Sequence, residues 1–305
     1  MIRLPAGVIA PNLTPFDDDL AIATDLYVDH AKRLLADGCV ALAPFGTTGE
    51  ALSVGINERK SALEALVAAG IDPQRLVPGT GLTNLLDTAE LTRHAVDLGC
   101  AGAMILPPFY FKGVADDGLH AYFARLIERV GRDRLSVYLY HIPQIAGVGL
   151  PVAVVRRLRR DFPDQIVGIK DSSGDWANTT ALLEIDGLVV YPGSELPLLE
   201  ALALGAPGCI TATANLNAAA IAEVIRLARA GKPEAAEARH VEVKAFRLLL
   251  QDYAPIPAQK RLLALSTGDR RWANVRPPLL AMSEARGAAL AEALARQQGL
   301  ALAPT

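Results

Sequence analysis

Three glycine–cysteine junctions give this chain its most restrictive pattern. They stand in the stretches LLADGCVALAPFG, AVDLGCAGAMILPP and ALGAPGCITATAN, at Cys39, Cys100 and Cys209. In each stretch an expected helix reaches a glycine, and the chain then passes directly into an apolar run. A junction that recurs in this way is typical of a repeated unit of helix and strand.

Further short apolar runs alternate with helical patterns along the chain: GVIAPNLTPF, RLVPGT, LSVYLY, QIVGIK and LVVYPG. Most of the eight expected strands are apolar on both faces, as buried parallel strands are. An open, doubly wound sheet would carry a glycine-rich phosphate fingerprint after its first strand, where this chain has APNLTPF. The pattern therefore favours the α/β class and predicts a closed TIM (β/α)8 barrel.

The last expected strand, GCITATAN, ends near Asn215. About ninety residues follow it, and they have an almost entirely helical pattern. A closed barrel does not need all of them. We therefore expect a barrel catalytic domain over residues 1–230 and a C-terminal helical extension over residues 231–305, packed on the barrel. The stretch APIPAQ supplies a proline-rich break within the extension.

Composition excludes several classes of function. Hydrophobic residues make up 51% and charged residues 21%, and the net charge of -3 gives no surface for a polyanion, so we expect no nucleic-acid partner. Three cysteines without a CxxC spacing indicate neither a disulfide framework nor a zinc site. The start of the chain lacks a long apolar run, and we expect a cytoplasmic protein with no membrane partner.

A lysine ends one of the expected strands, in the stretch IVGIKDSSGD. Active sites of such barrels lie at the C-terminal ends of the strands. Lys170 would there either extend to solvent or pair with Asp171 or Asp175. Alternatively, an amine held among apolar side chains is more easily neutral and attacks a ketone to form a Schiff base.

Two neighbouring features supply groups that such chemistry needs. Tyr140 ends the preceding strand, and its phenol is a candidate proton donor and acceptor. The turn GTTGE carries Gly46, Thr47 and Thr48, whose amides and hydroxyls are candidates for binding an anionic group or relaying protons. The same turn is also explained by a threonine cap with Glu50 in the first helical turn.

Four stretches in this order, GTTGE, PPFYF, YHIPQIAGV and GIKDSSGD, resemble the dihydrodipicolinate synthase and N-acetylneuraminate lyase family of class I aldolases. The resemblance implies that Lys170 forms the imine with pyruvate, that Tyr140 is the general acid and base, and that the turn receives the keto acid's carboxylate. Thr48 completes the expected catalytic set with Tyr110, which the family resemblance assigns to a neighbouring subunit of a homotetramer. The resemblance implies that the reaction requires no metal and no dissociable cofactor.

The branch within the family follows from two departures. Synthases usually carry an arginine in the segment after the tyrosine, and Ile145 stands at that position here, which favours the lyase-like branch. Sialic acid lyases carry a Gly-Tyr-Asp-Glu run where this chain has residues 193–196, GSEL, so sialic acid is not the expected substrate. Matching lyase positions give the candidate contacts for the far end of the substrate: Ser172, Gly193, Glu195 and Thr211.

These residues predict an aldolase that cleaves or forms a 4-hydroxy-2-keto acid, in particular a 2-keto-3-deoxy sugar acid, with a keto acid and an aldehyde as its small-molecule partners. A dehydratase that uses the same lysine imine is the first alternative. A non-catalytic keto-acid-binding regulator is a second, but it would have no chemical need for Lys170, Tyr140 and Thr48 together. A phosphate-sugar isomerase would carry a glycine-rich phosphate loop after the last two strands, where YPGSE and TATAN stand.

Overall fold

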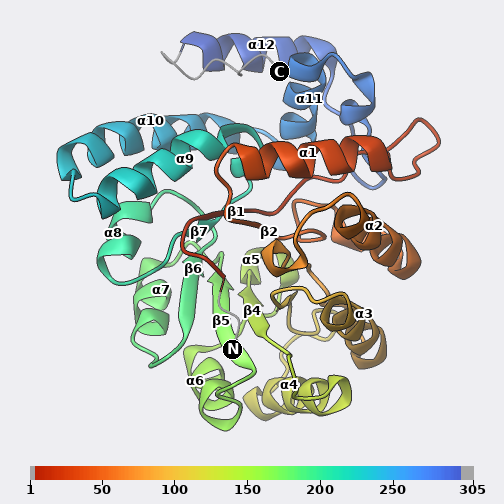
Figure 1. The fold of residues 1–305 in the computed structure, drawn as a ribbon, viewed down its shortest axis with the longest axis vertical. Coiled ribbons are helices and arrows are strands. Elements are labelled where there is room, and N and C mark those ends of the chain that lie inside the picture. Colours follow the sequence, from red (N-terminus) through yellow and green to blue (C-terminus); the bar gives the residue numbers. More distant parts are fainter. Residues whose placement is uncertain (1–3, 297–305) are drawn as a thin grey trace.

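Short strands form the centre of the computed structural model, and helices surround them (Figure 1). The structure describes residues 4–296. The strands in this part of the chain are β1 Val8–Ala10, β2 Ala41–Leu42, β3 Ala103–Ile105, β4 Val137–His141, β5 Ile166–Asp171, β6 Val189–Pro192 and β7 Cys209–Ile210. The α-helices are α1 Thr24–Ala36, α2 Ile56–Ala68, α3 Leu85–Asp97, α4 Asp116–Val130, α5 Pro143–Ala146, α6 Val152–Asp161, α7 Trp176–Leu183, α8 Leu198–Ala203, α9 Ala214–Arg229, α10 Pro233–Gln251, α11 Pro255–Thr267 and α12 Glu284–Arg296. Three 3-10 turns complete these elements: η1 Ala51–Ser53, η2 Pro73–Arg75 and η3 Arg270–Ala273.

All strand pairing in the two sheets is parallel, with the orders β2-β1-β7 and β3-β4-β5-β6. The predicted strand RLVPGT joins the two sheets, because Leu76 makes a parallel bridge to Leu42 and Gly79 makes another to Met104. β6 and β7 are neighbours, and the described residues form no ladder between them. The predicted (β/α)8 barrel is confirmed, with its third strand reduced to two bridges.

The strand β4 shows how the barrel interior is built. Tyr138 and Tyr140 face the inner core, whereas Val137 and Leu139 pack in the layer between strands and helices. This alternation is the two-residue period of an extended chain. Both faces are buried, which explains why the strand is largely apolar up to His141 and why the sequence pattern identified it.

The last strand is shorter than predicted. GCITATAN was expected to remain extended to about Asn215, but β7 ends at Ile210 and α9 begins at Ala214. The chain turns here because the amide of Ala214 donates to the carbonyl of Thr211 over 3.3 Å. Threonine favours strands on average, and this local turn overrides that preference.

The C-terminal helices pack on the barrel helices rather than standing apart. α10 lies along α9, and α11 and α12 lie beyond α1 in Figure 1. A separate apolar cluster, which includes Phe246, Leu262 and Leu290, joins α10, α11 and α12. The predicted boundary at residue 230 falls between α9 and α10, and residues 297–305 of the predicted extension lie outside the described part of the chain.

A buried histidine connects the first and last parts of the barrel. His30 Nε2 lies 2.8 Å from Oδ1 of Asn215, whose amide nitrogen donates to the carbonyls of Pro11 and Ala212. Nε2 must therefore carry the proton, and Nδ1 accepts a hydrogen bond from Arg33 over 3.0 Å. Burial lowers the pKa of His30 to about 3, and the charge of Arg33 acts in the same direction.

This histidine predicts a loss of stability in mild acid. Unfolding restores an ordinary pKa near 6.5, so below that pH the unfolded chain binds a proton that the folded chain refuses until about pH 3. The free energy of unfolding should then fall by up to about 1.4 kcal/mol per pH unit because of this group. Urea titrations between pH 7 and pH 4 should give a shallower fall for His30→Gln than for the wild type. Equal slopes would contradict the assignment, and His94→Gln, at a partly exposed position on α3, is the control.

Candidate active site

A cavity of about 740 Å³ opens at the C-terminal end of the strands. Six of the predicted site residues line it: Thr47, Thr48, Tyr140, Lys170, Ser172 and Gly193. They come from the turn after β2 and from the ends of β4, β5 and β6. This is the end of a parallel barrel where loops from different strands converge on one site.

Lys170 and Tyr140 lie side by side because β4 and β5 pair in parallel with these two residues as register partners. Lys170 is only 4% exposed, and its Nζ lies 3.4 Å from the Tyr140 hydroxyl and 4.5 Å from the centre of the tyrosine ring. The described residues form no ion pair with Lys170. The amine therefore faces the cavity beside a phenol.

The alternative of a salt bridge from Lys170 to its neighbouring aspartates does not hold. Asp171 points to the other side of β5, where it accepts hydrogen bonds from Thr179 over 2.7 Å and from Asn178 over 3.0 Å. Asp175 caps α7 by accepting from the amide of Ala177 over 2.9 Å. Both carboxylates are used to fix the loop after β5, which leaves the lysine free for the cavity.

The turn after β2 brings one threonine to the tyrosine. Thr47 Oγ1 lies 3.2 Å from the Tyr140 hydroxyl. Thr48 lines the same cavity, but no hydrogen bond joins it to Tyr140. The predicted role of Thr48 in the catalytic set is therefore better filled by Thr47, and Thr48 stays a candidate contact for the substrate's carboxylate. Two adjacent threonines cannot be told apart by sequence pattern.

Backbone strain at both ends of this turn is held by packing. Phe45 and Glu50 adopt positive φ angles of 57° and 53°, which are costly for residues with a side chain. Between them, a Cβ at Gly49 would lie 2.9 Å from the carbonyl oxygen of Asn12, so only glycine fits. The turn is thus pressed against β1 in one conformation.

A buried ion pair fixes the end of the turn. The Glu50 carboxylate contacts the ammonium of Lys260 on α11, and neither side chain is exposed. The carboxylate also accepts the backbone amide of Arg276 over 3.1 Å. Burial lowers the pKa of Lys260 to about 8, and Glu50 opposes the fall, so the lysine keeps its proton at pH 7. The C-terminal helices therefore hold, from outside the barrel, the turn that carries Thr47 and Thr48.

Ser172 and Gly193 meet at the cavity wall. A Cβ on Gly193 would lie 1.9 Å from Ser172 Oγ, so the close approach of β5 and β6 requires glycine here. The amide of Gly193 donates to the carbonyl of Asp171 over 2.6 Å. Both predicted contacts for the substrate face the cavity.

Three predicted contacts are not at the cavity surface. Glu195 and Thr211 are both fully buried, and they bond to each other beneath the cavity because the carboxylate accepts the hydroxyls of Thr211 and Thr213. Neither residue lines the cavity, and their expected contact with substrate stays a prediction. Gly46 lies behind the turn, where its carbonyl accepts from Ala51 over 3.3 Å. A match of single positions to the family pattern does not reveal whether a side chain is buried.

Tyr110 lies away from Lys170, in the loop between β3 and α4. Its side chain is 74% exposed and packs edge-on against Phe111, with the ring centres 5.5 Å apart. Phe111 is 73% exposed as well. Tyr110 does not line the cavity of its own chain, and its service to a neighbouring subunit stays a prediction.

The sequence reasoning missed the cavity wall that α10 and α11 provide. Arg247 and Gln251 stand four residues apart on α10 and so share one face of that helix, and Ile256 and Gln259 continue the wall on α11. The sequence shows that these residues share one face of a helix, but it does not show that this face points toward the ends of the strands. Ile145, which is 64% exposed, lines the opposite part of the cavity on α5.

Within residues 4–296, no three histidine, cysteine, aspartate or glutamate side chains are grouped in a way that could hold a metal ion. In the same range, none of the helices has the length and apolar character needed to cross a membrane.

Residues 4–297 match the model of the dihydrodipicolinate synthetase family, and the chain belongs to this family. A protein of Chloroflexus aurantiacus, named an uncharacterized DapA-like lyase, is 36% identical over 96% of this chain and 97% of its own length. The 4-hydroxy-tetrahydrodipicolinate synthase of Thermus thermophilus is also 36% identical, over 90% of each chain. The chain is therefore an enzyme, of the class of pyruvate-dependent lyases.

The fold agrees with a solved relative. The structure of YagE, an Escherichia coli K12 prophage protein of the dihydrodipicolinic acid synthase family in complex with pyruvate, superposes with a TM-score of 0.89. It is 26% identical to this chain, and the match covers 97% of this chain and 99% of that one. The barrel and the C-terminal helices are thus shared with this relative.

The buried ion pair generates a prediction about stability. Lys260→Met should lower the free energy of unfolding by about 3–5 kcal/mol, because it leaves the Glu50 carboxylate buried without a cation. The double variant Glu50→Gln with Lys260→Met should recover a large part of that loss. Urea unfolding at pH 7 measures both. A single variant within about 1 kcal/mol of the wild type would show that the pair does not hold the turn.

Proposed function

We propose that this enzyme is a class I aldolase that forms or cleaves a 4-hydroxy-2-keto acid, with pyruvate as donor or product. The observation that carries the proposal is the position of the Lys170 amine, which faces a 740 Å³ cavity and lies 3.4 Å from the Tyr140 hydroxyl. An amine in this position can attack the carbonyl carbon of pyruvate. Loss of water from the carbinolamine then gives the imine.

Tyr140 and Thr47 supply the proton transfers. The phenol is close enough to Lys170 to donate a proton to the departing hydroxyl of the carbinolamine, and Thr47 Oγ1 at 3.2 Å extends the chain of hydroxyls. The protonated imine withdraws electrons, so the tyrosinate that this donation leaves on Tyr140 takes a proton from the methyl group, and an enamine and a neutral phenol form. The enamine carbon attacks the aldehyde, and a proton from Tyr140 completes the 4-hydroxyl group. The imine is the electron sink, so this mechanism needs neither a metal nor a dissociable cofactor.

Within this class we propose a lyase-like activity on 2-keto-3-deoxy sugar acids rather than lysine biosynthesis. Ile145 supports this choice, because an aliphatic side chain at the cavity cannot bind a carboxylate through two hydrogen bonds. The synthase name of the Thermus thermophilus relative points the other way, so aspartate semialdehyde belongs in the substrate screen. A dehydratase would release water and keep all carbons, and analysis of products separates it from an aldolase.

We also propose that the enzyme assembles as a homotetramer, a dimer of dimers. The two exposed aromatic side chains Tyr110 and Phe111 support a contact between subunits, because large apolar side chains are enriched at such contacts. In this assembly Tyr110 would reach the cavity of the neighbouring chain.

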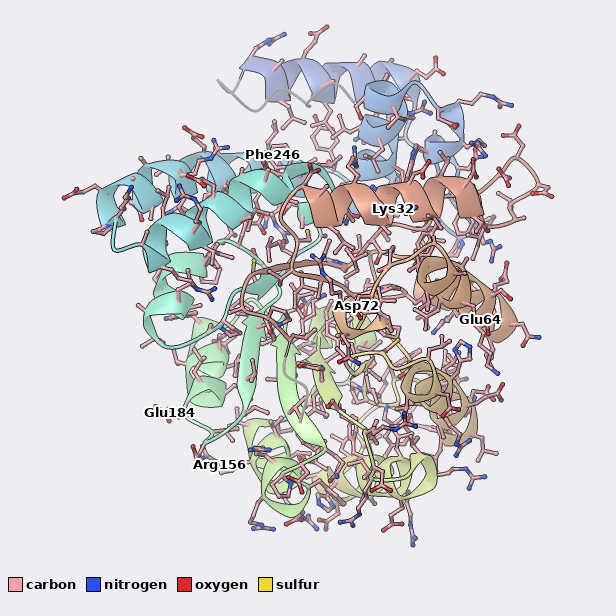
Figure 2. All side chains as sticks on the ribbon, viewed as in Figure 1. Lys32, Glu64, Asp72, Arg156, Glu184 and Phe246 are labelled. Atoms are coloured by element: carbon pink, nitrogen blue, oxygen red, sulfur yellow. The ribbon has the colours of Figure 1, made fainter. Side chains whose placement is uncertain are left out.

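The imine itself is the first test. Incubation with pyruvate and borohydride should give a reduced adduct, and peptide mapping should locate it on Lys170. Lys170→Ala should lose the adduct, whereas Lys32→Ala on the exposed face of α1 should keep it (Figure 2). An unmodified wild-type mass at saturating pyruvate would remove the central step of the proposal.

The two threonines of the turn should affect different kinetic constants. Tyr140→Phe should lower kcat by about 10²–10⁴-fold, because it removes the proton donor. Thr47→Val should lower kcat to a smaller extent, since it breaks the hydrogen bond to Tyr140, and Thr48→Val should chiefly raise the KM for pyruvate. Steady-state kinetics with pyruvate and a panel of aldehydes measures each constant. The reverse split between the threonine variants would restore the original assignment of Thr48.

A further inference from the structure

Arg247 places a second cation at the cavity, in addition to Lys170. The side chain extends from α10, on which Figure 2 marks the preceding residue Phe246, and it is 21% exposed. Among the described residues that line the cavity, Arg247 and Lys170 are the only two cations. Imine formation occupies Lys170, so Arg247 is the cation that remains for another part of the substrate.

One side of the guanidinium is anchored to the barrel. Nη1 lies 3.8 Å from a carboxylate oxygen of Glu195 and 3.4 Å from Thr211 Oγ1. Glu195 is itself held by Thr211 and Thr213, so the anchor is rigid. Nε of Arg247 is buried and has no hydrogen-bond partner among the described residues. The exposed part of the guanidinium lines the cavity, where it can donate charge-assisted hydrogen bonds to a carboxylate.

The other charges at the cavity leave this cation available. Asp171 lines the cavity but its carboxylate is bound to Thr179 and Asn178. Glu200 stands at the exposed start of α8. The keto acid's own carboxylate has the hydroxyls and amides of the Thr47 and Thr48 turn, so it does not need the arginine.

We propose that Arg247 binds a carboxylate at the far end of the substrate, so that among the 2-keto-3-deoxy sugar acids the preferred substrates are those with a second, terminal carboxylate. This inference rests on the proposed function, since it requires that the 2-keto end is bound to Lys170. A cavity of about 740 Å³ accommodates a six-carbon chain between the two ends.

Two six-carbon keto acids test the inference without any carbon–carbon chemistry. 2-Ketoadipate and 2-ketohexanoate have the same length and differ in whether a carboxylate or a methyl group ends the chain. We expect wild-type enzyme to form the borohydride-reducible adduct at about 30-fold lower concentrations of 2-ketoadipate than of 2-ketohexanoate. Arg247→Met should abolish most of this preference, and Arg247→Lys should keep only part of it because an ammonium lacks the fork.

Arg239→Met is the matched control, because Arg239 lies on the same helix, pairs with Glu242 and does not line the cavity. This variant should keep the wild-type preference. Equal trapping of the two acids by the wild type would overturn the inference while a pyruvate adduct on Lys170 left the proposed function intact. A preference that survives in Arg247→Met would also overturn it. If pyruvate gives no adduct at all, the proposed function fails and the inference falls with it.

Discussion

The parallel pairing of β4 with β5 is the constraint on which the active site depends. It makes Tyr140 and Lys170 partners across the ladder, so both side chains point to the barrel interior at the end where the strands open. A shift of one residue would turn the lysine toward the helices. Apolar packing on both faces of these strands prevents that shift, because all the remaining side chains of the strand would also move to the opposite face. The reactive geometry is therefore a result of core packing.

The sequence predicted the barrel well because its signals are local and repeated. Many helices end at or just before a glycine and the strands are largely apolar, so neither signal needs knowledge of distant contacts. Strand length was predicted less well. Thr211 and Thr213 favour a strand by composition, but their hydroxyls bond Glu195 and the backbone turns into α9. A buried carboxylate eighteen residues earlier in the chain than Thr213 cannot be seen in the pattern of a single segment.

The prediction of cavity-lining residues was most accurate for residues that lie at the ends of strands. Lys170 and Tyr140 were recognised as candidate site residues because the barrel brings all strand ends to one side. The roles of Thr47 and Thr48 were not separated, because the two residues differ only in the direction of their side chains. Arg247 was missed for another reason. It comes from a helix beyond the eight units, and no spacing rule connects that helix to the strand ends. Such residues are found only when tertiary packing is known.

The pair between Glu50 and Lys260 joins an early part of the chain to a late one. During synthesis the turn that carries Thr47 leaves the ribosome long before α11 does. Until then the carboxylate of Glu50 has no buried cation, and the strained turn has no support on that side. Lys170 is therefore synthesised well before the residues that complete the pocket around its side chain. Completion of the last helices is the event that converts a folding barrel with an exposed amine into an enzyme.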